Sequence, residues 1–122
     1  MIAEVAVLDF AAISFKSVWA LELLLVVKQE PARAWSADEI IRDLRSSHGV
    51  VAEALGNLIA VRLAAQDGAG CYRYQAGAAG LDEMVNAVEK LYATKPAAVI
   101  RAIVTSPNRK LQILSDAFRF KE

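Results

Sequence analysis

The chain has 122 residues, 56% of them hydrophobic, and its 14 basic and 14 acidic side chains give a net charge of zero. This length suits one domain with its own core, and the single Cys71 excludes an internal disulfide. The longest apolar run, residues 18–27, is too short to span a bilayer, so we expect no membrane partner. A mean hydropathy of +0.32 is high for a small monomer and predicts a homodimer.

The N-terminal part contains two apolar segments. Residues 2–13 lack the basic stretch of a secretory signal, which favours a cytoplasmic protein, and they fit a helix better than a short strand. Residues 14–30 predict a second helix that ends at Pro31. Its apolar residues recur at helical spacing and form an expected core face, which includes Trp19, Leu23, Val26 and Val27.

Two shorter helices follow, separated by a tight turn. Ser36 and Glu39 have the spacing of a capping box and predict a helix start that runs to about Arg45. Ser47 can cap the next helix, which ends near Arg62. The apolar residues that we expect these helices to bury are Ile40, Ile41, Leu44, Val51, Leu55, Leu58 and Ile59.

A hairpin follows the second of these helices. The glycines of residues 67–70 permit a tight turn, with expected strands over 63–66 and 71–74. Cys71 lies in the second strand, where a packed thiol is the simpler interpretation and a redox sensor is the alternative.

The C-terminal region from Leu81 is helical by its apolar spacing. Pro96 and the pair Ser106-Pro107 each predict a break or a restart. The last helix would carry Leu111, Ile113, Leu114, Ala117 and Phe118. Residues 90–122 hold seven basic and two acidic side chains, including Arg109, Lys110, Arg119 and Lys121. These cations could bind phosphates, dock an acidic partner, or simply favour the C-terminal ends of helices.

This order of elements is contained in residues 19–74, with the sequence WALELLLVVKQEPARAWSADEIIRDLRSSHGVVAEALGNLIAVRLAAQDGAGCYRY. The segment resembles the MarR-like winged helix-turn-helix transcription regulators of bacteria. The resemblance implies a mainly α fold with a small β-hairpin. We expect a single domain, residues 1–122, with a winged-helix core over 14–76 and helical extensions over 1–13 and 81–122 as oligomerisation elements. The N-terminal segment would pack against another subunit or against the C-terminal helices. Such regulators are dimers that place the second motif helix in the major groove, while the wing touches the backbone. One departure is Arg62, which stands where the family commonly has a left-handed glycine. The helix could therefore end differently, or Arg62 could point along the DNA or toward a partner.

The resemblance gives a DNA-binding hypothesis for specific residues. Bases would be read from the second motif helix by Ser46, Ser47, His48, Glu53 and Asn57. Phosphates would be bound by Arg42, Arg45, Arg62 and Arg73. Residues 36–75 nevertheless carry four basic and five acidic side chains, which is a weak electrostatic footprint for a nucleic-acid protein.

Small residues form a stripe on the same outward face, at Gly49, Ala52, Gly56 and Ala60. A solvent-facing helix can tolerate such residues, although each glycine costs about 1 kcal/mol relative to alanine. Small side chains also permit close approach of DNA or of another protein. The stripe therefore supports an alternative function, a winged helix that binds a protein partner and no DNA.

Catalytic and metal chemistry lack candidates in the sequence. His48 is the only histidine, and no orienting carboxylate for a triad is evident beside it. The pairs Asp38/Glu39 and Asp82/Glu83 begin helices, where they complement the helix dipole. No phosphate loop, dinucleotide fingerprint or metal-ligand spacing occurs, so we expect no enzyme activity, no cofactor and no metal site.

Overall fold

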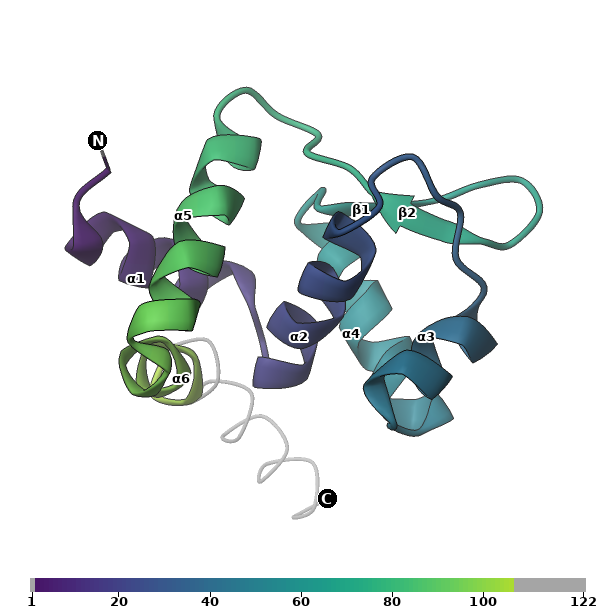
Figure 1. The fold of residues 1–122 in the computed structure, drawn as a ribbon, viewed down its shortest axis with the longest axis horizontal. Coiled ribbons are helices and arrows are strands. Elements are labelled where there is room, and N and C mark those ends of the chain that lie inside the picture. The colour runs from purple at the N-terminus through teal and green to yellow at the C-terminus, as the bar shows by residue number, and fades with distance from the viewer. Residues whose placement is uncertain (1, 107–122) are drawn as a thin grey trace, which may run out of the picture.

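The computed structural model describes residues 2–106 (Figure 1). Within them the chain forms α1 (Glu4–Ser14), α2 (Val18–Lys28), α3 (Ala37–Leu44), α4 (His48–Ala60), β1 (Ala64–Gln66), β2 (Tyr72–Tyr74), α5 (Leu81–Thr94) and α6 (Pro96–Val104). The strands pair antiparallel, with Ala65 opposite Arg73. The predicted class, mainly α with one small hairpin, is confirmed.

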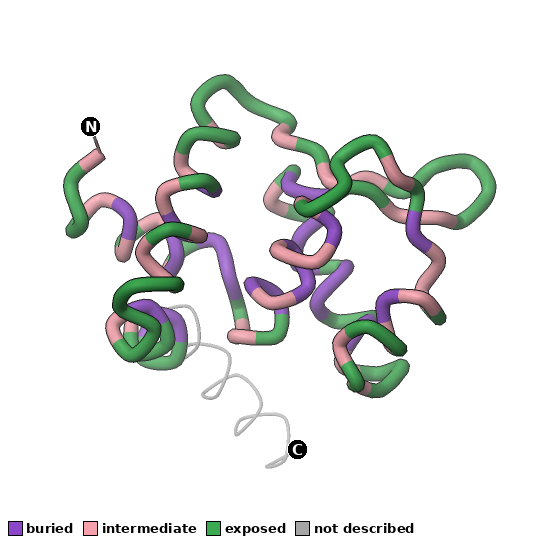
Figure 2. The backbone as a smooth tube through the Cα atoms, in the orientation of Figure 1, coloured by how far each residue is buried: buried purple, intermediate pink, exposed green. Residues whose placement is uncertain are grey.

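The helices form two groups that meet at α2 and α6. On the right of Figure 1, α2, α3 and α4 pack on one another, and the hairpin contacts both α2 and α4. On the left, α1, α5 and α6 pack together, and α6 also contacts α2. Figure 2 shows buried backbone along α2 and α4 in the middle of the molecule. Leu21, Leu24 and Leu58 are fully buried there and hold the two groups around one core.

The N-terminal segment is helical, as we expect from its sequence, but the next helix begins later than predicted. A single helix over 14–30 is wrong, because α1 continues to Ser14 and α2 starts at Val18. The Ser17 side chain accepts a hydrogen bond from the Ala20 N–H at 3.2 Å and caps α2. Phe15, extended and buried, fills the corner between the two helices.

Two residues predicted for the core are exposed. Trp19 has 42% of its surface exposed and Ile59 has 38%. Trp19 lies in the first turn of α2, one turn before the fully buried Leu23, and Ile59 lies near the end of α4. Helical spacing predicts which side of the helix a side chain is on. It does not predict whether the neighbouring elements extend far enough along the helix to bury that side chain.

Pro96 restarts the chain as the first residue of α6, as predicted. The expected last helix, with Leu111, Ile113, Leu114, Ala117 and Phe118, and the cations Arg109, Lys110, Arg119 and Lys121 fall outside the described residues.

Within residues 2–106, no single helix is long and apolar enough to cross a membrane. Of the helices in this described part, α1 and α2 satisfy length and composition when taken together, but they are bent by 104° at their junction.

Candidate nucleic-acid interface

The capping box at the start of α3 is present as predicted. The Ser36 hydroxyl accepts from the Glu39 N–H at 3.2 Å, and the Glu39 carboxylate accepts from the Ser36 N–H at 2.9 Å. Arg33 donates to the other oxygen of the same carboxylate at 2.6 Å. The bond from the Ser36 backbone, followed by that from Arg33, lowers the pKa of Glu39 to about 2. The start of α3 is therefore anchored by a charged side chain with several partners.

The turn between α3 and α4 is closed by an arginine in the left-handed conformation. Arg45 has φ of 53°, and its N–H donates to the Arg42 carbonyl at 3.3 Å. The Ser46 N–H donates to the Ile41 carbonyl at 3.1 Å. These two bonds form a Schellman motif, and Ser47 then caps α4 by accepting from the Val50 N–H.

The end of α4 repeats this arrangement. Arg62 has φ of 64° and donates to the Ile59 carbonyl at 3.1 Å, while the Leu63 N–H donates to the Leu58 carbonyl at 2.8 Å. Arg62 thus adopts the left-handed conformation itself, although an arginine in place of glycine left open how the helix would end, and the left-handed Arg45 was not predicted. Among residues 2–106, these two arginines are the non-glycine residues with positive φ.

Gly77 makes room for Arg62. A Cβ on Gly77 would lie 2.9 Å from the Arg62 Cβ and 3.2 Å from its carbonyl oxygen. The Gly77 N–H donates to that same oxygen at 2.9 Å. The chain after β2 thus passes directly against the end of α4, and only glycine fits there without displacement.

The hairpin is tied to the helical motif at its base. Trp35, which immediately precedes the cap of α3, exchanges two backbone hydrogen bonds of 2.7 Å with Tyr72. At the tip, the Asp67 carboxylate accepts from the N–H groups of Ala69 and Cys71, both at 2.9 Å, and Gly70 adopts φ of 81°. The hairpin therefore has an ordered base and a turn organised by Asp67.

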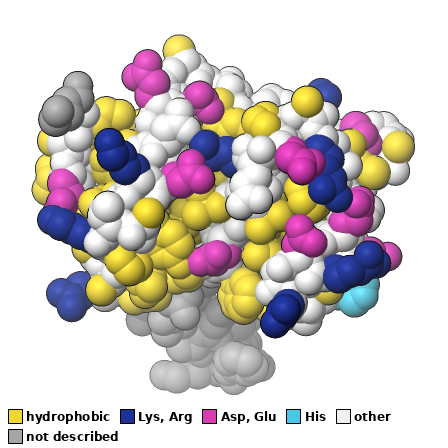
Figure 3. All heavy atoms as spheres, viewed as in Figure 1, with side chains coloured by type: hydrophobic (Ala, Val, Ile, Leu, Met, Phe, Trp, Pro, Cys, Tyr) yellow, Lys and Arg dark blue, Asp and Glu magenta, His cyan; other side chains and the backbone are white. Residues whose placement is uncertain are grey.

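Most of the predicted DNA-binding residues lie on the surface. Ser46 is half-buried, and the exposed ones are Arg42, Arg45, Ser47, His48, Glu53, Arg62 and Arg73. Within residues 2–106 none of these arginines forms an ion pair, although Lys28, Arg33 and Lys95 do. Figure 3 shows basic side chains beside the single histidine, at the end of the molecule where Figure 1 places α3 and α4.

Asn57 is a correction to the sequence prediction, which placed it on the outward face of α4. The residue is only 6% exposed. Its amide donates to the Ser14 carbonyl at 2.8 Å and accepts from the Lys16 N–H at 2.8 Å. Both polar atoms of the side chain are thereby occupied, and Asn57 joins α4 to the corner after α1 instead of facing a base.

The small-residue stripe does face outward. Gly49, Ala52, Gly56 and Ala60 are all exposed. A Cβ added at Gly49 or Gly56 would meet no heavy atom within 4 Å. The outer surface of α4 is therefore smooth and open, and Glu53 and His48 are the charged or titratable groups on it.

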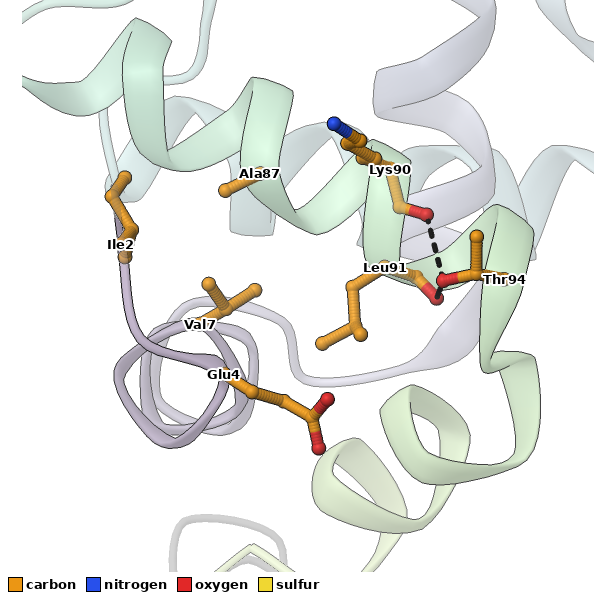
Figure 4. Close-up of a pocket in the computed structure, with 7 residues that line it drawn as sticks. All are labelled: Ile2, Glu4, Val7, Ala87, Lys90, Leu91 and Thr94. Carbon is orange, nitrogen blue, oxygen red and sulfur yellow. Dashed lines mark hydrogen bonds between the residues drawn. The ribbon is translucent and has the colours of Figure 1, made fainter.

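A separate hollow of about 380 Å³ lies between α1 and α5, away from this motif (Figure 4). Ile2, Val7, Ala87 and Leu91 give it apolar walls. Two of its polar side chains, those of Glu4 and Thr94, already have partners. Glu4 pairs with Lys95 at 2.9 Å, and the Thr94 hydroxyl donates to carbonyls of its own helix. Among residues 2–106 no group of three or more potential metal ligands is found.

Comparison with protein-family models, with curated proteins and with solved structures finds no match.

Proposed function

We propose that the protein is a winged-helix DNA-binding regulator of the MarR-like kind, acting as a homodimer. In this proposal α3 and α4 form the helix-turn-helix and the β1–β2 hairpin forms the wing. The element order, the Schellman turn between the helices and the backbone pairing of Trp35 with Tyr72 support it.

The observation that carries the proposal is the pair of left-handed arginines. A non-glycine residue in this conformation costs about 1 kcal/mol, which glycine would avoid. Arg45 and Arg62 stand at these positions, exposed and without an ion pair among the described residues. A helix seated in the major groove has a phosphate backbone on each side, and a guanidinium at each end of α4 suits that arrangement.

The outer surface of α4 predicts modest sequence selectivity. With Asn57 buried, the side chains left to read base edges are mainly Ser47, His48 and Glu53. The Glu53 carboxylate can accept a hydrogen bond from the amino group of a cytosine, whereas a nearby phosphate would repel it. We infer that backbone contacts and DNA shape supply most of the binding free energy.

The test is fluorescence anisotropy of a labelled duplex of mixed sequence, titrated with protein across a salt series. We expect binding that weakens steeply with salt, and Arg73→Ala should reduce the slope of log K against log salt by about one. Arg101→Ala is the matched control, because Arg101 is an exposed arginine of α6 outside the motif. Absence of binding at low salt would contradict the proposal.

Exposed apolar side chains on α1 and α6 support the dimer. Val5 is 69% exposed, Ile100 36% and Val104 43%. Burial of such residues against a second copy would be favourable, at about 25 cal/mol per Å² of apolar surface. Val104→Lys should therefore lower the molar mass measured by light scattering from dimer to monomer. A wild-type protein that is monomeric at high concentration would exclude this part of the proposal.

The open surface of α4 favours a second candidate, a protein-interaction module that binds no DNA. Gly49 and Gly56 leave space for a partner helix or loop to approach the backbone. If a protein binds there, Gly56→Leu should abolish complex formation and Arg73→Ala should do little. If DNA binds there, Arg73→Ala should weaken binding to every duplex.

A further inference from the structure

A groove between α2 and α3 is lined by apolar side chains that the residues of the 2–106 range leave partly exposed. Its volume is about 510 Å³, and its lining residues are Val18, Trp19, Glu22, Val26, Asp43 and Leu44. Trp19 stands in it with 42% of its surface exposed, whereas Trp35 is 3% exposed. The groove exposes an indole and several aliphatic side chains to water. Such a surface favours an occupant with an apolar side.

The charges of the groove are negative. Asp43 is exposed and forms no ion pair with any residue of the 2–106 range. Glu22 accepts a short hydrogen bond from the Tyr92 hydroxyl, and burial together with this bond raises the pKa of Tyr92 to about 12. Among the described residues, no basic side chain lines the groove. The occupant should therefore combine an apolar side with positive charge.

The chain itself contains a sequence of this kind, PNRKLQILSDAFRFKE, residues 107–122. Leu111, Leu114 and Phe118 recur at the three- and four-residue spacing of an amphipathic helix. Four basic residues, Arg109, Lys110, Arg119 and Lys121, outnumber the acidic Asp116 and Glu122. Both requirements of the groove are met by this segment.

The segment also starts in the right place. It follows α6, which ends at Val104 and contacts α2, one wall of the groove. Sixteen residues span about 24 Å if helical and more if extended, which exceeds the ~16 Å length of α2. The segment is therefore long enough to run along α2 within one molecule.

We propose that residues 107–122 bind the α2–α3 groove of their own chain, with Leu111, Leu114 and Phe118 against Trp19 and Leu44, and with their cations beside Glu22 and Asp43. This contact is independent of DNA binding. It would cover the exposed indole and neutralise Asp43 on the first helix of the motif.

The experiment measures acrylamide quenching and the emission maximum of tryptophan in the full-length protein. Trp35 is buried and serves as an internal reference, so differences between variants report on Trp19. We expect Trp19 to be shielded in the wild type. The double substitution Leu114→Ser with Phe118→Ser should increase quenching and shift the emission to the red, and Gln112→Ser, on the polar side of the segment, should leave both unchanged.

A second variant acts on the groove and leaves the segment intact. Asp43→Lys reverses the charge of the rim, and a cation near the C-terminal end of α3 is favourable for that helix. It should release Trp19 as the double substitution does, while Glu53→Lys on α4, the control of equal charge change, should not. Circular dichroism checks that each variant is folded.

Three results would overturn the proposal. The first is a wild-type Trp19 that is already freely quenched. The second is an Asp43→Lys protein, folded by circular dichroism, whose Trp19 stays shielded. The third is shielding that disappears on dilution, which would show that the segment comes from a second copy.

Discussion

The side-chain amide of Asn57 donates a 2.8 Å hydrogen bond to the backbone carbonyl of Ser14. With the bond from the Lys16 N–H to its oxygen, this contact ties the middle of α4 to the corner between α1 and α2. We propose that α4 reads DNA, but Asn57 on that helix has a structural role. It connects α4 to the N-terminal helix.

Asn57→Ala should destabilise the protein by about 3 kcal/mol. The substitution leaves the Ser14 carbonyl and the Lys16 N–H without their partner and opens a small cavity. Asn86→Ala is the matched control. Asn86 is exposed on α5, and its replacement should change stability by no more than about 0.5 kcal/mol. Urea unfolding followed by circular dichroism gives both values. Equal effects of the two substitutions would contradict the assigned role.

Arg45→Gly should separate stability from DNA binding. Glycine relieves the positive φ of 53° and should raise stability by up to about 1 kcal/mol. The same change removes a guanidinium and should weaken duplex binding. Thermal unfolding and anisotropy on one preparation test both expectations. A more stable protein with unchanged affinity would show that Arg45 contacts no phosphate.

Two glycines should respond to alanine in opposite directions. Gly77→Ala places a Cβ 2.9 Å from the Arg62 Cβ and should destabilise the fold by about 1–3 kcal/mol. Gly56→Ala adds a Cβ in open space on a helix and should stabilise by about 0.5–1 kcal/mol. The double variant Arg62→Gly with Gly77→Ala should recover part of the loss, since one of the clashing atoms is then gone. Additive effects in this cycle would argue against the contact.

The capping box makes stability depend on pH through Glu39. Its pKa is about 2 in the folded protein against an ordinary value of 4.5, so the folded state favours the carboxylate. This contribution is fully present above about pH 4.5 and is lost as the pH falls toward 2. Glu39→Gln can keep the box geometry but does not titrate. The melting temperatures of wild type and Glu39→Gln should therefore differ at pH 6 and converge near pH 2, whereas a constant difference would exclude this role.

Local signals in the sequence predicted much of the fold and part of the site. The capping box, the Ser47 cap, the hairpin turn and the restart at Pro96 depend on neighbouring residues, and all are present. The left-handed conformation after α4 was not predicted, because the resemblance marked Arg62 only as a departure from the usual glycine.

The failures concern contacts between distant segments. Asn57 was placed by its helical angle, yet its partners Ser14 and Lys16 lie more than 40 positions away in the chain. Trp19 was assigned to the core by its spacing, but no neighbouring element among the described residues covers the first turn of α2 fully. The closeness of Gly77 to Arg62 likewise exists only after the hairpin has returned to α4.

The reciprocal hydrogen bonds between Trp35 and Tyr72 have a mechanical consequence. Because Trp35 adjoins the cap of α3, the base of the hairpin and the start of that helix share one joint. We therefore expect the hairpin to be held at its base instead of moving independently of α3. Bending of the β1–β2 hairpin should be coupled, through Trp35, to tilting of the first turn of α3.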